Sequence, residues 1–166
     1  MKMISVITPV FNEEENIALC YQRIKGIFAR ELPAYAYEHI FADNDSRDRT
    51  PELLCGIAAE DRNVKVIFNA RNFGAVESNF HALMSATGDA VIVSAPADLQ
   101  DPPELIPQFV QHWERGYDVV YGIRSSREEG LLLRSIRSLF YHLVTAWTPF
   151  PVPEMQANSS SLTAAF

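Results

Sequence analysis

The feature that most constrains the fold of this chain is a regular alternation between short apolar runs and amphipathic stretches. Runs rich in β-branched and aromatic residues predict five strands, at residues 4–10, 38–42, 64–68, 90–95 and 118–123. Helical patterns of apolar residues separate these runs. Strands and helices that alternate in this way form parallel sheets with right-handed crossovers. We therefore expect an α/β fold, in which a mostly parallel, Rossmann-like sheet carries helices on both faces.

Residues with capping side chains indicate where the helices begin. Asn12 is predicted to be an N-cap, with Glu15 as its partner in a capping box. Thr50 is predicted to cap the next helix, with Pro51 at the first helical position. In the third helix, at residues 75–86, three apolar side chains are predicted to face the core: Val76, Phe80 and Leu83.

The composition changes beyond residue 127, and we expect two regions. Residues 1–127 form the predicted domain core, and residues 128–166 form an incomplete remainder with an amphipathic helix and an irregular tail. The helix is predicted at residues 131–147, where packing on its own domain is favoured over the alternative of lying on a membrane surface. Residues 158–166 carry no strong strand or helix signal. We therefore expect the chain to be a truncated form of a longer protein.

Charge and composition narrow the classes of function. The chain has 21 acidic and 14 basic residues, a net charge of −7, which argues against a nucleic-acid-binding surface. Cys20 and Cys55 fall on apolar helix faces, which predicts that both are buried. No uncharged apolar stretch is long enough to cross a bilayer, and the N-terminus does not resemble a signal peptide. We expect a cytoplasmic protein, or one at the cytoplasmic face of a membrane.

Polar side chains collect where the predicted strands end. In an open parallel sheet, ligands bind beyond the carboxyl ends of the strands. Turn preferences explain any one of these loops equally well, but carboxylates that recur at one edge favour a binding site. The candidate residues, strand by strand, are Thr8, Pro9, Asn12 and Glu13; Asp43, Asn44, Asp45 and Ser46; Arg71, Asn72, Phe73 and Gly74; Asp98, Gln100 and Asp101; and Arg124.

The sequence lacks the two glycine-rich motifs that commonly bind phosphate groups. No G-x-G-x-x-G follows the first strand, and no G-x-x-x-x-G-K-[ST] is present. A bound diphosphate then needs another source of positive charge, and a divalent cation held by carboxylates would supply it. Asp98 is the best candidate ligand for such a cation. Asp101 is at least as well explained as a helix N-cap, with Pro102 at the first helical position.

Six segments carry a more specific signal. They are SVITPVFNEE (5–14), ADNDSRDRT (42–50), RNFG (71–74), GD (88–89), ADLQDPPE (97–104) and GYDVVYG (116–122). In order and spacing they resemble the family 2 glycosyltransferases, which have the GT-A fold. The resemblance covers residues 3–127, and ADLQDPPE is most similar to the polyprenyl-phosphate glycosyltransferases, including enzymes like dolichol-phosphate mannose synthase. Each segment alone is a weak signal, whereas the ordered set is specific.

The resemblance implies a role for most of the candidate residues. In the family, the matching positions bind a nucleotide diphosphate sugar and a divalent metal, Mg²⁺ or Mn²⁺, which acts as a Lewis acid on the leaving diphosphate. Asp43 would contact the base, Arg71 would border the nucleotide, and Arg124, with Arg127 as a second candidate, would face phosphate groups. The implied nucleotide-sugar-binding residues are Pro9, Asn12, Glu13, Asp43, Asn44, Arg71, Asn72, Gly74, Ala97, Asp98 and Arg124, and the implied metal ligands are Asp98 and Gln100.

The sequence departs from the family pattern in several places. Pro96 occupies the first position of the usual Asp-x-Asp metal motif, and Asn44 stands where a second aspartate is usual. The later family motif with an acidic general base has no clear match, so no residue is predicted to be catalytic. The C-terminal transmembrane helices of the family are also missing from the sequence.

We therefore expect a hexosyltransferase fragment that binds a nucleotide diphosphate sugar with Mg²⁺ or Mn²⁺. In the full-length protein, the sugar would pass to a polyprenyl-phosphate-type acceptor. An inactive binding or scaffold module with the same fold is the alternative, because of Pro96 and the missing base motif. A nucleotidyltransferase shares the sheet and the metal chemistry, but its basic signature loop has no match here. Peripheral membrane contact and oligomerisation are both left open.

Overall fold

The computed structural model describes residues 1–93, 97–99, 101–122 and 162–165, and the statements below concern these residues. The chain divides into two compact units, Met1–Gln111 and His112–Phe166. The elements are, in order, β1 (Met3–Val10), α1 (Ile17–Arg30), β2 (Ala36–Asp43), α2 (Thr50–Glu60), β3 (Val64–Phe68), α3 (Ala75–Met84), β4 (Ala90–Ile92), the short 3-10 helix η1 (Pro103–Leu105), α4 (Ile106–Glu114), β5 (Val119–Gly122) and β6 (Leu162–Ala165).

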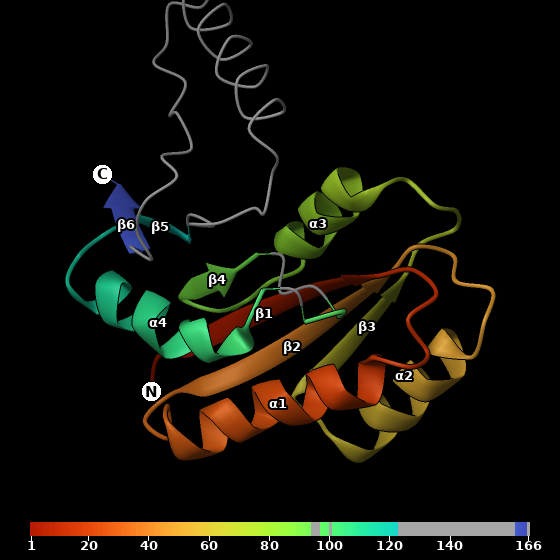
Figure 1. Ribbon diagram of the computed structural model, residues 1–166, viewed down its shortest axis with the longest axis horizontal. Coiled ribbons are helices and arrows are strands. Elements are labelled where there is room, and N and C mark those ends of the chain that lie inside the picture. Colours follow the sequence, from red (N-terminus) through yellow and green to blue (C-terminus); the bar gives the residue numbers. More distant parts are fainter. Residues whose placement is uncertain (94–96, 100, 123–161, 166) are drawn as a thin grey trace, which may run out of the picture. The chain divides into compact units, whose positions relative to one another are not determined.

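Four strands of the first unit form a parallel sheet in the order β3-β2-β1-β4 (Figure 1). β1 and β2 lie in the middle and pair along their whole length, from Met3 opposite Ala36 to Val10 opposite Asp43. Because all four strands run the same way, their carboxyl ends share one edge of the sheet, where a ligand can bind. The expected α/β fold with a mostly parallel sheet is confirmed.

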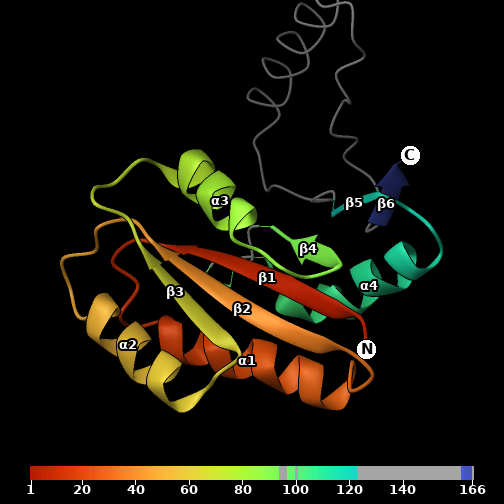
Figure 2. The same cartoon turned by 180° about the vertical axis from the view of Figure 1, so that it is seen from behind.

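Helices cover both faces of this sheet, as predicted. α1 and α2 lie on one face and α3 lies on the other (Figures 1 and 2). Beneath α3, Ile7, Ile40 and Ala42 of the two central strands pack with Ala82. The central strands are therefore buried on both faces, which explains their nearly continuous apolar sequence. On the opposite face, α1 buries one stripe of side chains: Ile17, Cys20, Tyr21, Ile24, Ile27 and Phe28.

A buried carboxylate ties the amino-terminal half of the sheet together. Glu38 of β2 is 4% exposed, accepts hydrogen bonds from Ser5 and Thr87, and forms an ion pair with Lys65 of β3. Burial by itself raises the pKa of a carboxyl group, but these partners lower the pKa of Glu38 to about 2. A Cβ atom on the neighbouring Gly88 would lie 2.7 Å from the Ser5 backbone nitrogen, so glycine is required there.

The observed helix starts differ from the predicted caps. α1 begins at Ile17 with Asn16 as its N-cap, so the prediction that Asn12 is the N-cap is wrong. The Asn12 side chain instead accepts a hydrogen bond from the loop after β2. α2 begins at Thr50 itself, whose hydroxyl binds the backbone amide of Glu13 rather than an amide of its own helix. In both cases a contact with another loop has engaged the side chain that capping would require.

α3 turns a different face to the sheet from the one predicted. Its buried residues are Ser78 and Ala82. The residues predicted to face the core are 78% (Val76), 63% (Phe80) and 36% (Leu83) exposed. On the inward face, the Ser78 hydroxyl accepts a hydrogen bond from the buried Asn69, and Ala82 packs against the two central strands.

The two cysteines, both predicted to be buried, differ in their exposure. α2 buries Thr50 and Leu54, so Cys55 at the next position is exposed and the prediction that it is buried is wrong. Cys20 of α1 is buried, as expected. None of the described helices combines the length and the apolar composition needed to cross a membrane.

The fifth predicted strand is present, but its partner is not the one expected. β5 pairs antiparallel with β6, from Val119 opposite Ala165 to Gly122 opposite Leu162. The tail, for which the sequence indicates no strand, therefore contributes one. Strand propensity depends strongly on context, and here the pairing with β5 supplies the order that the tail sequence does not predict. The helix predicted at residues 131–147 lies outside the described residues.

Candidate functional site

Two loops that follow β1 and β2 are held together by hydrogen bonds from backbone amides to side chains. The first loop joins β1 to α1, and the second joins β2 to α2 (Figure 1). Every second residue from Ser46 to Thr50 accepts a hydrogen bond from a backbone amide of the first loop. The pairs are Ser46 with Asn12 (2.9 Å), Thr50 with Glu13 (2.8 Å) and Asp48 with Glu14 (3.2 Å). Much of the polar pattern at residues 42–50 therefore serves loop architecture.

The first loop contributes two side chains to the same contact. Asn12 Oδ1 accepts a hydrogen bond from the Arg47 backbone amide at 2.8 Å, and Glu14 Oε2 accepts one from the Arg49 amide at 2.9 Å. Asn12 has a φ of 55°, a left-handed conformation that asparagine adopts more readily than most residues. Its side-chain oxygen therefore has a partner within the loop pair, and its predicted contact with the nucleotide stays a prediction.

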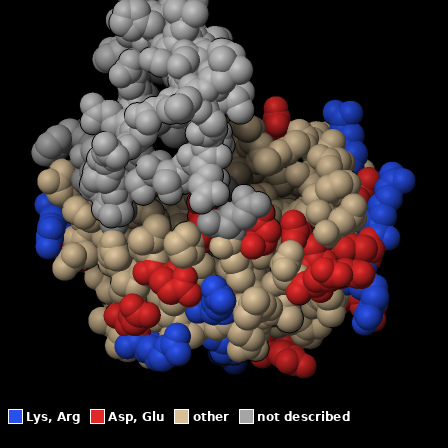
Figure 3. All heavy atoms as spheres, in the orientation of Figure 1, with Lys and Arg blue, Asp and Glu red and all other residues tan. Residues whose placement is uncertain are grey.

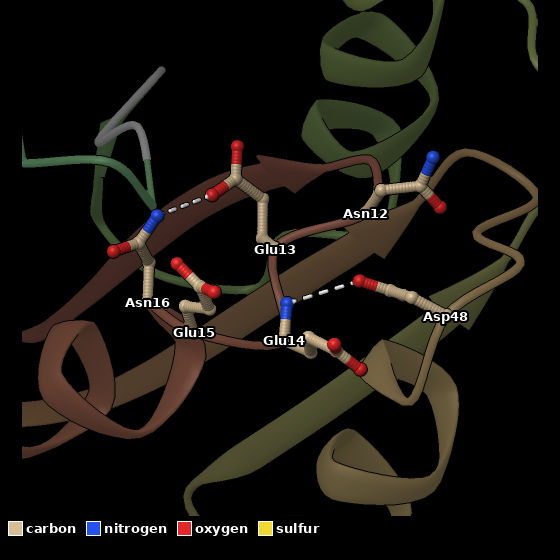
Figure 4. Close-up of a pocket in the computed structure, with 6 residues that line it drawn as sticks. All are labelled: Asn12, Glu13, Glu14, Glu15, Asn16 and Asp48. Carbon is tan, nitrogen blue, oxygen red and sulfur yellow. Dashed lines mark hydrogen bonds between the residues drawn. The ribbon is translucent and has the colours of Figure 1, made fainter.

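A hollow in this loop pair has an acidic lining (Figure 4). The residues that line it are Asn12, Glu13, Glu14, Glu15, Asn16 and Asp48. Acidic side chains also gather on the face shown in space-filling view (Figure 3). One carboxylate oxygen of Glu13 accepts a hydrogen bond from the side-chain amide of Asn16 at 2.8 Å, which orients the carboxylate (Figure 4). Because like charges repel, a phosphate would approach this lining only together with a cation.

Asp43 is the last residue of β2, and its two carboxylate oxygens differ in their hydrogen bonding. The residue is 2% exposed, and its Oδ2 accepts a hydrogen bond from the Ser46 amide at 3.2 Å. Its Oδ1 is buried and has no hydrogen-bond partner among the described residues. On the neighbouring strand, the half-buried Pro9 pairs with Ala42, next to Asp43. The structure therefore brings Pro9 and Asp43 to the same strand ends, and their contacts with a ligand stay predictions.

The turn that follows β3 is attached to the end of β2 by Asn44. Its side-chain oxygen accepts a hydrogen bond from the Phe73 amide at 3.3 Å, and its side-chain nitrogen donates to the Gly74 carbonyl at 3.0 Å. Asn72 Oδ1 accepts from the Gly74 amide at 2.8 Å, and the φ of 89° at Gly74 favours glycine. The Arg71 guanidinium lies 4.7 Å from the centre of the Phe73 ring. Asn44 and the predicted residues of this turn are therefore brought together.

Asn69 belongs to the same cluster, although no sequence motif predicted its role. It is 8% exposed, its backbone amide donates to the Asp43 carbonyl at 2.9 Å, and its side-chain nitrogen donates to the Asn44 oxygen at 3.1 Å. The available signal was an asparagine directly after an apolar strand. This position is buried and polar because it connects the ends of β2 and β3.

Residues 97–99 form a turn that follows β4. Ala97 is buried, Asp98 is exposed, and Leu99 has a φ of 57°. Burial raises the pKa of the Cys20 thiol in α1 to about 11, and the nearby carboxylates of Glu13 and Asp98 add to the rise. The contact of Asp98 with a nucleotide sugar or a metal stays a prediction.

Several other predicted site residues have no described position. Gln100, Arg124 and Arg127 lie outside the described residues, as does Pro96. Asp101 is described, but η1 begins at Pro103 with Pro102 as its N-cap, so the interpretation of Asp101 as the helix cap is wrong. Its alternative role in the site stays a prediction.

The family model described as "Glycosyl transferase family 2" matches residues 5–162, nearly the whole chain. The chain belongs to glycosyl transferase family 2. Its curated relatives agree with this assignment. The family 2 chain is 37% identical over 150 residues to YkcC, an uncharacterized glycosyltransferase of Bacillus subtilis (strain 168), in an alignment that covers 90% of the chain and 46% of the relative.

A second relative carries a more specific name. The family 2 chain is 39% identical over 141 residues to the prophage bactoprenol glucosyl transferase homolog of Escherichia coli (strain K12), with 84% of the chain and 45% of the relative covered. The chain therefore spans about half the length of the curated relatives it matches.

The fold resembles that of a solved glycosyltransferase. The mannosyltransferase PcManGT from Pyrobaculum calidifontis, in complex with GDP-Man and Mn²⁺, matches with a TM-score of 0.58 and 21% identity, over 74% of this chain and 35% of that one. At this identity the similarity shows the fold alone. It confirms the GT-A fold expected for the family 2 chain.

The described part of the family 2 chain contains one of the two predicted metal ligands. No three acidic, histidine or cysteine side chains within it are grouped so that they could hold a metal ion. The predicted ligand with a described position is Asp98, an exposed residue of the turn after β4. Carboxylate oxygens suit Mg²⁺ and Mn²⁺, which commonly bind through one or two carboxylates together with substrate phosphates. Asp98 has the chemistry of such a ligand, and its role in binding a metal stays a prediction.

Proposed function

We propose that this chain is the donor-binding part of a glycosyltransferase of the hexosyltransferase class, and that it binds a nucleotide diphosphate sugar at the carboxyl edge of its parallel sheet. The observation that carries the proposal is the buried Oδ1 of Asp43, which has no partner among the described residues. A buried polar atom without a partner is destabilising, and an N–H donor of a nucleobase would satisfy it. Membership of family 2 supports the same assignment.

Two charged residues suit the rest of the donor. The turn from Arg71 to Gly74 is attached beside Asp43 through Asn44, and its exposed arginine can meet a negatively charged group of the nucleotide. In our proposal Asp98, with Gln100, holds Mg²⁺ or Mn²⁺ against the diphosphate. The metal, when bound, would offset the charge that develops on the leaving nucleoside diphosphate.

The acceptor proposed for the full-length protein is a polyprenyl phosphate at the cytoplasmic face of the membrane. The support is the name of the Escherichia coli relative, a bactoprenol glucosyl transferase homolog, together with the similarity of ADLQDPPE to polyprenyl-phosphate glycosyltransferases. Arg124 is the residue that we propose for contact with a phosphate group.

Calorimetric titration of UDP, GDP and their sugars, with and without Mg²⁺ or Mn²⁺, tests the donor site. We expect one nucleotide series to bind in a metal-dependent manner. Asp98→Ala should weaken that binding by at least about tenfold, because it removes a negatively charged metal ligand. Glu31→Ala is the matched control, since it removes an exposed carboxylate at the far end of α1 and should leave the affinity unchanged. A folded protein that binds none of these nucleotides would refute the proposal, and an unchanged affinity of the Asp98 variant would remove that residue from the site.

An inactive module that binds the donor without transferring the sugar is the second candidate. Pro96 in the place of the first metal-motif aspartate favours it, because one carboxylate ligand is lost. Release of nucleoside diphosphate by the full-length protein, in the presence of a polyprenyl phosphate, separates the two candidates. Release supports the transferase, and donor binding without release supports the module.

A further inference from the structure

The orientation of the Asn44 side chain is set by two backbone groups. Asn44 follows β2 directly and is 4% exposed. Its oxygen faces the Phe73 amide, which can only donate, and its nitrogen faces the Gly74 carbonyl, which can only accept. The amide therefore cannot be flipped without losing both hydrogen bonds. A carboxylate has no donor, so an aspartate here would place an oxygen against the Gly74 carbonyl.

A second buried asparagine, Asn69, restrains the side chain of Asn44. The Asn69 side-chain nitrogen donates to the Asn44 oxygen at 3.1 Å and to the Ser78 hydroxyl at 3.0 Å. The Asn69 oxygen lies 3.1 Å from His81 Nδ1, so that this ring nitrogen carries the proton. All four side-chain polar atoms of the two asparagines thus have partners, on the β2 end, the β3 end, α3 and the turn. Fully satisfied buried networks of this kind make a structure rigid.

We propose that Asn44 is a positioning residue, whose amide fixes the turn from Arg71 to Gly74 in the place from which Arg71 meets the donor. The inference rests on the proposed function, because it assumes that a nucleotide lies at this edge of the sheet. It also gives a physical reason for asparagine at a position where the family usually has aspartate. In this chain the turn needs one donor and one acceptor from the same side chain, and an amide supplies both.

Asn44→Asp is the decisive variant, because it keeps the shape and the acceptor, replaces the donor with an oxygen and adds a negative charge. We expect amide hydrogen exchange at residues 71–74, measured without nucleotide, to become about tenfold faster, and the affinity for the nucleoside diphosphate with Mn²⁺ to fall about tenfold. Glu38→Gln is the matched control: Glu38 is equally buried and lies on β2, the strand that Asn44 follows, but near the other end of that strand. It should lower the melting temperature and leave both the exchange of the turn and the nucleotide affinity unchanged.

A double-mutant cycle with Arg71→Gln separates positioning from general destabilisation. If Asn44 acts through Arg71, Asn44→Asp should weaken binding much less in the Arg71→Gln background than in the wild type. Equal effects in both backgrounds, or exchange and affinity at wild-type levels in Asn44→Asp, would overturn the inference. If the wild type binds no nucleotide, the proposed function fails and the exchange data alone decide whether Asn44 anchors the turn. If Asn44→Asp does not fold, Ser78→Ala removes one partner of Asn69 and should raise the exchange of the turn to a smaller extent; unchanged exchange there would count against the network.

Discussion

At the scale of the residue, the polar side chains at the strand ends differ in what their atoms bind. Ser46 and Thr50 accept hydrogen bonds from backbone amides of the neighbouring loop. Asp43 keeps a buried oxygen that has no partner among the described residues. A sequence motif cannot separate these cases, because both kinds are polar residues that follow a strand. The partner of each atom, more than the residue type, distinguishes a scaffold residue from a candidate ligand contact.

A buried histidine makes the stability of this protein depend on pH. His39 of β2 is fully buried, and its Nε2 lies 2.8 Å from the Thr8 hydroxyl. Burial lowers the pKa of His39 to about 3 from its ordinary value of 6.5. As the pH falls below 6.5, His39 becomes protonated in the unfolded chain, whereas the buried imidazole of the folded chain stays neutral until the pH approaches 3. The stability present above pH 6.5 is therefore lost progressively as the pH falls towards 3.

We expect His39 to lower the free energy of unfolding by about 2 kcal/mol between pH 7 and pH 5. His39→Gln cannot titrate, so its unfolding free energy should depend much less on pH in this range, whatever its value at pH 7. Urea unfolding of both proteins at pH 7, 6 and 5 measures the two slopes. Glu38 and Asp61, whose hydrogen bonds and ion pairs hold their pKa values at about 2 despite burial, contribute mainly below pH 4.5. Equal slopes for the two proteins would contradict this prediction.

At the scale of the element, the loops after β1 and β2 act as one unit. Each provides side-chain acceptors for backbone amides of the other, so neither can move without breaking hydrogen bonds. Surface loops usually leave such amides to water. Here the hydrogen bonds between the two loops hold Asn12 and Glu13 in place beside the candidate donor site. A motif within one loop does not predict bonds of this kind.

Thr50→Val tests the central bond of this loop pair. Thr50 is fully buried, and its hydroxyl accepts the Glu13 amide at 2.8 Å. The valine keeps the shape of the side chain and leaves that amide without its partner, which should cost about 1–3 kcal/mol of stability. We also expect faster amide exchange at residue 13. Thr50→Ser keeps the hydroxyl and is the control; wild-type exchange at residue 13 in the valine variant would show that the bond does not hold the loop.

At the scale of the whole molecule, the described residues form two sheets of different size, one in each compact unit. β1 and β2 are flanked by strands on both sides and covered by helices on both faces. The Glu38 network connects β1, β2, β3 and the segment before β4. The pair of β5 and β6 belongs to the other compact unit and is only two strands wide. Isolated two-stranded pairs are weakly stable by themselves.

Native-state hydrogen exchange should therefore show two levels of protection. Amides of β1 and β2 should exchange only through global unfolding, and at least about a hundredfold more slowly than amides of β5. Exchange of the β5 amides should respond weakly to low urea concentrations, because a local opening exposes little surface. The measurement is exchange across a series of urea concentrations below the transition. Equal protection and equal urea dependence in both regions would show that the two units unfold together.

Local patterns in the sequence were sufficient to predict much of this protein. The four parallel strands and the helices between them follow from apolar periodicity, which depends on neighbours in the chain. Because the strands are parallel, their carboxyl ends share one edge of the sheet, and the sequence predicted that polar residues gather there. The ordered motifs predicted the family. It also identified the turn from Arg71 to Gly74, since those residues are contiguous.

Contacts between distant residues decided the rest. The Asn12 side chain accepts a hydrogen bond from a residue 35 positions away, which engages the atom that a helix cap would use, and Asn69 bonds Asn44 across 25 residues, which no local pattern predicts. The face that α3 buries includes the bond between Asn69 and Ser78, and the antiparallel partner of β5 comes from the far end of the chain. The sequence by itself determined the α/β architecture and the family, because these rest on short-range periodicity and ordered motifs. Only the tertiary structure decided which polar atoms hold the scaffold and which lack a hydrogen-bond partner among the described residues, because a hydrogen bond needs both partners in place.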